Sequence, residues 1–300
     1  MITVQQLTKS FEGFQALSHL DMNVKKGSIY GLVGTNGAGK TTVIKHITGI
    51  YRGDQGHVLM DGQPVYDNQA VKGRTGYVPD DLYFFGGYSL SEMGEFYQRV
   101  YQNWNPDRFS QMIQRFGLDP QKKITSFSKG MQKQATFILS LCTMPDYLIL
   151  DEPIDGLDPI IRKLVWKYIV DDVGEREMTV LVSSHNLREM ENICDSIGII
   201  SNGKMVIERD LDELRSDIHK VQVAFPKEKN GEDLFNQLHI LHREKRGSVD
   251  LLIIRNRREE VEELLGKAQP LVFDMLPLTL EEIFIYELGG ADDEIQGIIF

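Results

Sequence analysis

Cysteine is scarce in this sequence. The 300 residues include only two, Cys142 and Cys194, which stand in unrelated contexts. A disulfide framework needs several cysteines at regular spacing, so we expect two buried, inert thiols. Long apolar runs are also lacking: none reaches the roughly 18 residues that suggest a membrane span, and the N-terminus lacks the charged and apolar segments of a signal peptide. These absences predict a cytoplasmic chain.

Positive charge is limited as well. Lysine and arginine number 33 against 44 aspartates and glutamates, for a formal net charge of -11. Binding to a phosphate backbone regardless of its sequence requires a basic stripe, and no long block of Lys or Arg is present. We therefore expect no nucleic-acid partner. With 41% hydrophobic and 26% charged residues, the chain is long enough for one large domain and a smaller one.

A glycine-rich stretch is the feature around which the rest of the chain is organised. It consists of Gly34, Thr35, Asn36, Gly37, Ala38, Gly39, Lys40, Thr41 and Thr42. An apolar run at 28–33 predicts a buried strand before it, and 43–48 predict a helix after it, which is the context of a phosphate-binding loop. Glycines let backbone N–H groups turn inward around a polyphosphate, and the helix start adds its positive dipole end. The stretch predicts an ATP or GTP site in which Lys40 faces the outer phosphates, Thr41 offers a hydroxyl to Mg²⁺, and Thr42 bonds the phosphate nearest the ribose.

Two carboxylates follow a second apolar run. Residues 147–150 predict a buried strand that delivers Asp151 and Glu152 at its C-terminal end, where ligands of an α/β sheet gather. The two side chains should point to opposite sides, so that one holds the magnesium shell while the other faces an attacking water. Residues 179–183 predict a further buried strand that ends near His185. A lone histidine in such a position is more often structural than functional.

The pattern of the first 215 residues predicts an α/β core with two additions. Short segments such as 57–60 suit an antiparallel side sheet, and helical periodicity over about 86–145 indicates a helical insertion. Within that insertion Ser128 is placed to cap a helix. Near the N-terminus, Phe11 or Phe14 could stack on an adenine ring or could equally be part of the core.

Beyond residue 215 the pattern changes. Predicted strands and helices follow one another in a β-α-β-β-α-β order, as in a ferredoxin-like α+β domain. Thr279 and Glu282 predict a capping box for a last amphipathic helix that carries Phe284. We therefore expect two domains, 1–215 and 216–300. The second is interpreted as an accessory dimerisation or regulatory domain, with a purely structural extension as the alternative.

Taken in order, the loop at Gly34, the segment 127–132, the segment 150–159 and His185 resemble the ATP-binding cassette family. The resemblance covers about residues 1–215 and is closest to the ATPase subunits of bacterial transporters. It implies a P-loop NTPase cassette fold. The segment 279–284 also resembles the tail of multidrug and antibiotic exporter subunits.

The resemblance implies a role for each matching residue. Gly34 to Thr42 match the Walker A loop, Asp151 the Walker B carboxylate that binds magnesium, and Glu152 the general base. His185 matches the histidine that contacts the terminal phosphate. The remaining matches are Phe11 with the base-stacking aromatic, Asp158 with the loop that faces the opposite subunit, and Ser128 and Gly130 with the signature motif.

Two departures from the family pattern stand out. Lys129 and Met131 replace a glycine and the glutamine of the signature motif, so the serine hydroxyl and the second glycine remain while the polar amide is lost. Asp80 stands where the family usually has a glutamine. Its carboxylate could bind Mg²⁺ directly or through water, but without the metal it would lie unfavourably near the phosphates.

The resemblance also implies partners. Two cassettes, identical or related, would face each other head to tail and hold ATP between Lys40 of one and Ser128 of the other. Hydrolysis of ATP would then power an integral membrane permease on a separate chain, with this chain peripheral on the inner face of the membrane and export the favoured direction. Two alternatives are a soluble cassette ATPase that remodels a nucleoprotein complex and an ATP-sensing regulatory module.

Overall fold

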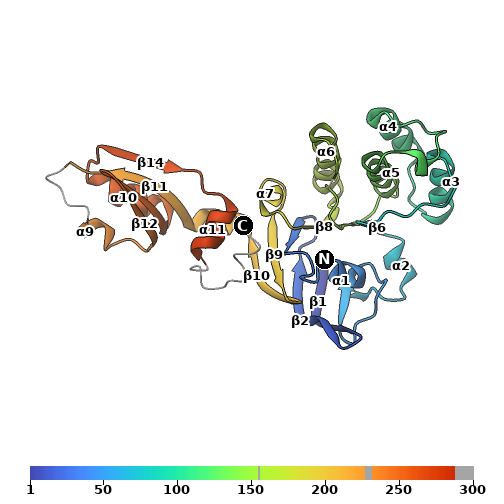
Figure 1. The fold of residues 1–300 in the computed structure, drawn as a ribbon, viewed down its shortest axis with the longest axis horizontal. Coiled ribbons are helices and arrows are strands. Elements are labelled where there is room, and N and C mark those ends of the chain that lie inside the picture. Colours follow the sequence, from blue (N-terminus) through green and yellow to red (C-terminus); the bar gives the residue numbers. More distant parts are fainter. Residues whose placement is uncertain (155, 227–231, 288–300) are drawn as a thin grey trace. The chain divides into compact units, whose positions relative to one another are not determined.

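The computed structural model describes residues 1–300 apart from 155, 227–231 and 288–300, and the side chains of 215–217, 284 and 287 are outside the description as well. One residue of the turn predicted at 154–159 and the side chain of Phe284 therefore lie outside the described part. The chain divides into two compact units. The first comprises Met1–His185 and Ile193–Glu208, and the second comprises Asn186–Asn192 and the chain from Arg209 onward. Each unit is described by itself (Figure 1).

A six-stranded sheet forms the centre of the first unit, in the order β10-β9-β3-β8-β7-β6. Every residue of β3, β7, β8 and β9 is buried, as expected for parallel strands covered on both faces. Neighbouring strands from β9 through β6 run parallel, so their C-terminal ends meet at one edge of the sheet. The strands are β3 (Ile29–Val33), β6 (Thr75–Val78), β7 (Tyr147–Leu150), β8 (Thr179–Ser184), β9 (Ser196–Ser201) and β10 (Lys204–Asp210).

An antiparallel side sheet, in the order β2-β1-β4-β5, lies in the same unit. In this sheet β1 pairs antiparallel with β2 and with β4, and β4 contains residues 57–60, for which the sequence predicted a side sheet. One continuous hydrophobic cluster joins this sheet, the helix α1 and the central strands, so the helix behind the glycine-rich loop is anchored in the core. The elements are β1 (Ile2–Phe11), β2 (Phe14–Val24), β4 (Gln55–Met60), β5 (Gln63–Pro64), α1 (Lys40–Ile47) and α2 (Gln69–Lys72).

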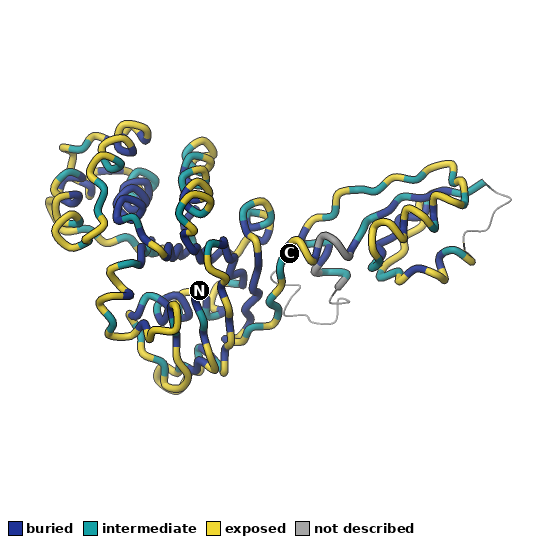
Figure 2. The backbone as a smooth tube through the Cα atoms, turned by 180° about the vertical axis from the view of Figure 1, so that it is seen from behind, coloured by how far each residue is buried: buried dark blue, intermediate teal, exposed yellow. Residues whose placement is uncertain are grey.

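The predicted helical insertion is present. It contains α3 (Leu90–Val100), α4 (Pro106–Phe116), a 3₁₀ turn (Ile124–Ser126) and α5 (Lys129–Cys142). Ser128 caps α5 as predicted, since its Oγ accepts a hydrogen bond from the Met131 N–H at 3.3 Å. All residues of α5 from Lys133 to Cys142 are buried, which Figure 2 shows as a dark helix among more exposed ones. The longer helix α6 (Pro159–Arg176) follows β7.

Both cysteines are free and buried, as the sequence predicted. Burial raises the pKa of the Cys142 thiol to about 12, because a thiolate is poorly solvated in the apolar interior. The thiol is therefore protonated at neutral pH and unreactive.

The second unit contains a four-stranded antiparallel sheet in the order β12-β13-β11-β14. In chain order its elements read β-α-β-β-α-β, which is the ferredoxin-like arrangement that the sequence predicted. The predicted capping box is present too: Thr279 Oγ1 accepts from the Glu282 N–H, and Glu282 Oε2 accepts from the Thr279 N–H. The elements are α7 (Leu187–Met190), α8 (Leu211–Asp217), β11 (Ile218–Ala224), α9 (Glu232–Phe235), β12 (Ile240–Arg246), β13 (Val249–Arg255), α10 (Arg258–Lys267), β14 (Val272–Leu276) and α11 (Leu280–Glu287).

Among the helices of the described residues, none combines the length and the apolar composition that crossing a bilayer would demand.

A bidentate ion pair joins the insertion to α6. Arg108 of α4 donates from both Nη atoms to Asp172 of α6 at 2.8 and 2.7 Å, and the Asp172 side chain is only 4% exposed. Removing one partner of a buried pair leaves the other charge without compensation.

We therefore expect D172A to lower the free energy of unfolding of this unit by about 3 kcal/mol. The measurement is urea denaturation followed by tryptophan fluorescence, because both tryptophans, Trp104 and Trp166, lie in this unit. K26A, which removes a well-exposed ion pair with Glu177, is the control and should leave the midpoint unchanged. Equal effects of the two variants would contradict the stabilising role of the buried pair.

Candidate functional site

The glycine-rich loop connects β3 to α1 and has a backbone that only glycine tolerates at several points. Gly37 and Gly39 have φ angles of +84° and +111°. A Cβ atom added to Gly34 would lie 2.5 Å from the backbone oxygen of Ile200, closer than any real contact. The loop therefore presents backbone rather than side chains in front of the N-terminus of α1, as a polyphosphate site requires.

Lys40, the first residue of α1, is buried against this loop. Its Nζ donates to the carbonyl oxygens of Gly34 at 2.7 Å and Thr35 at 3.2 Å. The same Nζ lies 3.1 Å from Glu152 Oε1. The ammonium group thus joins the glycine-rich loop to the carboxylate that follows β7.

Glu152 is held from both sides and has an uncommon backbone conformation. Its φ angle is +44°, in the left-handed region that glycine favours. One carboxylate oxygen faces Lys40, and the other, Oε2, lies 3.0 Å from His185 Nδ1, a ring nitrogen that can donate to it. Strain of this kind collects at functional sites, where the surrounding contacts enforce it.

Asp151 is buried, with 1% of its surface exposed. Its Oδ1 accepts a hydrogen bond from the Ser183 hydroxyl at 2.7 Å, whereas Oδ2 is buried and has no hydrogen-bond partner. Burial raises the pKa of this carboxyl, and hydrogen bonds from Ser183 and Thr41 act in the opposite direction. A free carboxylate oxygen next to a hydroxyl is a donor set that suits Mg²⁺, so Asp151 and Thr41 fit the ion.

The strand order explains why these groups meet. β3, β8 and β7 are neighbours and run parallel, and their last residues are followed by Gly34, His185 and Asp151. Segments up to 151 residues apart in the sequence, from Gly34 to His185, are therefore brought to the same edge of the sheet, where ligands of open α/β sheets bind.

Within the described residues, four other predicted site residues have no direct polar contact with these groups, although burial raises the pKa of Asp151 and the Asp80 charge adds to this effect. In the described part of the chain, Phe11, Asp80, Ser128 and Gly130 make no hydrogen bond or ion pair with Lys40, Asp151, Glu152 or His185. Asp80 is 57% exposed and lies 3.9 Å from Lys133 Nζ. A Cβ added to Gly130 would approach the Gly156 carbonyl to 3.0 Å, so the start of α5 lies close to the segment after Glu152.

Phe11 and Phe14 face each other at the β1–β2 hairpin. Phe11 is 38% exposed and packs edge-on against Tyr51, with ring centroids 5.5 Å apart, and Phe14 is 67% exposed. The interpretation of these residues as core is therefore wrong. Base stacking by Phe11 stays a prediction.

Two residues that hold Glu152 were missed in the sequence. The Glu152 N–H donates to Ser183 Oγ at 3.0 Å, and Lys133 Nζ donates to the Glu152 carbonyl oxygen at 3.0 Å. The serine pair that ends the apolar run of β8 was an available signal. Lys133 had only a weak signal, because the first two turns of α5 contain other polar residues as well.

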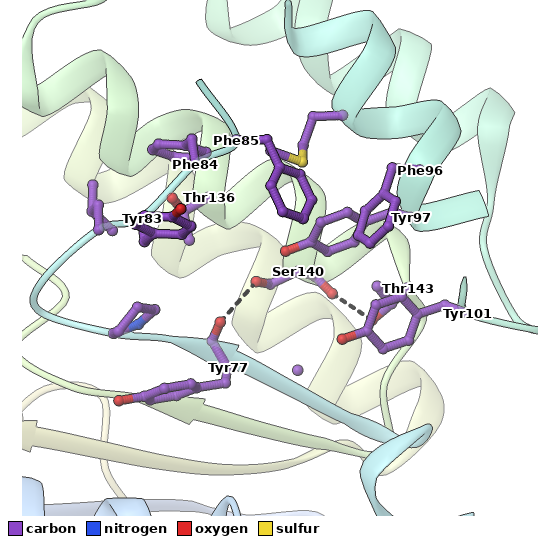
Figure 3. A pocket seen from close by; sticks show the side chains of 14 residues that line it. Tyr77, Tyr83, Phe84, Phe85, Phe96, Tyr97, Tyr101, Thr136, Ser140 and Thr143 are labelled. Atoms are coloured by element: carbon purple, nitrogen blue, oxygen red, sulfur yellow. Dashed lines mark hydrogen bonds between the residues drawn. The ribbon is translucent and has the colours of Figure 1, made fainter. Parts of the chain in front are cut away.

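An aromatic cavity of about 320 Å³ lies between the segment that follows β6 and the helices α3 and α5. Figure 3 shows Tyr83 and Phe84 on one side of it and the rings of Phe85, Phe96 and Tyr97 on the other. Tyr83 is 85% exposed, so the aromatic surface is accessible from outside.

Comparisons with known proteins agree with one another. A family model for the ABC transporter matches residues 17–155. The chain is 32% identical over 290 residues to the ABC transporter ATP-binding protein YtrB of Bacillus subtilis, covering 97% of this chain and 99% of that protein. It is 32% identical over 218 residues to the bacitracin transport ATP-binding protein BcrA of Bacillus licheniformis, covering 72% of this chain and 71% of that protein.

Solved structures show the same fold. An ATP-binding subunit of an ABC transporter superposes with a TM-score of 0.67 at 25% identity, covering 72% of this chain and 92% of that chain. A dimeric bacterial ABC transporter cassette has a TM-score of 0.65 at 20% identity, covering 70% of this chain and 99% of that one.

Asp151 yields a prediction that separates the stability of the chain from its stabilisation by ligand. Its pKa is raised above the ordinary 3.8 by burial, so the folded chain binds a proton there more readily than the unfolded chain. The folded chain therefore loses stability as pH rises from 3.8 through the raised pKa of Asp151, because the buried carboxyl has to ionise. At neutral pH this loss is the free-energy cost of the buried charge. We expect D151N to raise the melting temperature at pH 7 without nucleotide, by roughly 3 °C for each kcal/mol recovered.

The same substitution should abolish the additional stabilisation by Mg²⁺ in the presence of ATP. Scanning calorimetry with and without Mg-ATP measures both effects. If D151N has a lower melting temperature than the unchanged protein in the absence of ligand, the buried charge of Asp151 does not lower the stability of the folded chain.

Proposed function

The chain belongs to the ABC transporter family as an ATP-binding subunit, and we propose that its ATPase activity resides at the ends of β3, β7 and β8, with Glu152 as general base. The observation that carries the proposal is the Glu152 carboxylate placed between Lys40 at 3.1 Å and His185 at 3.0 Å. A carboxylate in this position can accept a proton from a water that attacks the terminal phosphate.

Each residue of the site has a distinct task in this proposal. The loop from Gly34 to Thr42 binds the polyphosphate through backbone N–H groups, and Lys40 pairs with its outer phosphates. A phosphate competes with Glu152 for the same ammonium, so ATP releases the carboxylate from Lys40. His185 keeps the freed carboxylate oriented through Nδ1, and its other ring nitrogen contacts the terminal phosphate.

Asp151 and Thr41 would hold Mg²⁺, which neutralises charge on the phosphates when it is bound. Asp80 would belong to the same metal environment, because its charge acts on Asp151, and its exposed side chain would reach Mg²⁺ directly or through water.

We further propose that the site is completed by a second cassette, identical or related. Ser128 and Gly130, at the N-terminus of α5, would contact ATP bound to Lys40 of the other chain, and Phe11 would stack on the adenine. Hydrogen bonds to a charged group contribute about 1.5–3 kcal/mol each, so several of them can decide a dimerisation equilibrium. Loss of the bridging phosphate then shifts the population towards separated cassettes.

The aromatic cavity suits the membrane partner. A permease on a separate chain would insert an apolar segment beside Tyr83 and Phe85, where aromatic side chains supply a large contact area. This partner would hold the chain at the inner face of the membrane. Similarity to BcrA, a bacitracin transport protein, favours export, and the unit from Arg209 onward would act as an accessory dimerisation or regulatory domain.

The general-base role is tested with E152Q. Glutamine retains the shape of the side chain but cannot accept the proton, so kcat should fall by about 10² to 10⁴. ATP affinity, measured by calorimetry, should be retained or raised, because the amide carries no charge against the phosphates and competes less for Lys40. Hydrolysis at the original rate would remove Glu152 from its proposed role.

The docking role of the cavity is tested with Y83A/F85A. Loss of two exposed rings should weaken binding to host-cell membrane vesicles, depleted of the native chain, by about tenfold or more. The basal ATPase activity of the Y83A/F85A chain should be unchanged. Y66A, at a half-exposed tyrosine outside the cavity, is the control. Undiminished vesicle binding by Y83A/F85A would place the permease elsewhere.

A further inference from the structure

The carbonyl group of Glu152 is bound by a buried cation. Lys133, on the second turn of α5, is 9% exposed, and its Nζ donates to the Glu152 carbonyl oxygen at 3.0 Å. Resting on the proposed role of Glu152 as general base, we propose that Lys133 is a positioning residue for that base. It fixes the backbone of Glu152 and thereby aims the carboxylate.

The backbone of Glu152 requires such support. A non-glycine residue at φ +44° is strained and persists only where its surroundings enforce the conformation. Two contacts do so here: the N–H donates to Ser183 Oγ at 3.0 Å, and the carbonyl accepts from Lys133. Without the second contact the backbone of Glu152 can relax from its strained φ angle, and this relaxation displaces the carboxylate relative to His185.

The contact between Lys133 and the Glu152 carbonyl is unfavourable for packing alone, because it places a charged group in the interior. Burying an ammonium costs free energy unless it is paired, and a carbonyl oxygen is a neutral acceptor. Among the described carboxylates, Asp80 is the one that lies within 4 Å of Lys133, at 3.9 Å, and it is 57% exposed. The full positive charge strengthens the hydrogen bond to Glu152, because charge-assisted bonds are about twice as strong as neutral ones. Asp80 offsets part of the cost of that charge.

The position of Lys133 gives the contact a wider consequence. The same helix begins at the Ser128 cap, which the proposed function places against ATP of the other cassette. Lys133 therefore connects that end of α5 to Glu152 of its own chain. A shift of α5 on binding the opposite nucleotide would be transmitted to the general base.

The variant K133M tests the inference, because methionine has a similar length and no charge. We expect kcat for ATP to fall about tenfold while KM stays within twofold, since a misaimed base affects the transition state and not the binding of ATP. K133R retains a charged donor and should recover most of the rate. K167M, at an exposed lysine of α6, is the matched control and should behave as the unchanged protein.

A double substitution separates positioning from general loss of structure. In single-turnover hydrolysis, K133M should cost no further rate in an E152Q background, because the group through which Lys133 acts is already disabled. An equal tenfold loss in both backgrounds, or a K133M chain with unchanged kcat, would overturn the inference. A normal hydrolysis rate in E152Q alone would instead refute the general-base role, so the two failures are distinguishable.

Discussion

The structure depends on one topological constraint: three parallel strands, β3, β8 and β7, lie side by side and end at the same edge of a sheet. Because of this order, the glycine-rich loop, His185 and the pair Asp151–Glu152 meet although they are far apart in the sequence. The completely buried strands leave little freedom to shift their register. The site is therefore fixed by the core and not by its loops.

Electrostatics in the site oppose stability and favour ligand binding. Asp151 is buried with one unpaired oxygen, and Glu152 has a strained backbone and shares Lys40 with two loop carbonyls. Each of these features costs free energy in the folded chain. A cation at Asp151 and a polyphosphate at Lys40 would relieve them. The same arrangement that weakens the chain locally is what makes it receptive to its substrate.

Local sequence pattern was sufficient for much of this account. The glycine-rich loop between a strand and a helix, the strand before Asp151 and the β-α-β-β-α-β order of the second unit follow from periodicity and turn chemistry, which act within a few residues. Other features depend on tertiary contacts. The Lys133 contact with Glu152, the exposure of Phe11 and the assignment of Asn186–Asn192 to the second unit could not be derived, because each requires knowing which distant segment lies alongside.

The central claim is that Glu152 and the phosphates of ATP compete for the Lys40 ammonium. A crystal structure of the chain with Mg²⁺ and a non-hydrolysable ATP analogue tests it most directly. The account predicts that Lys40 Nζ contacts the outer phosphates and that Glu152 Oε1 has moved away from its present 3.1 Å separation. A Lys40–Glu152 contact that persists at this distance with the analogue bound in the loop would contradict it.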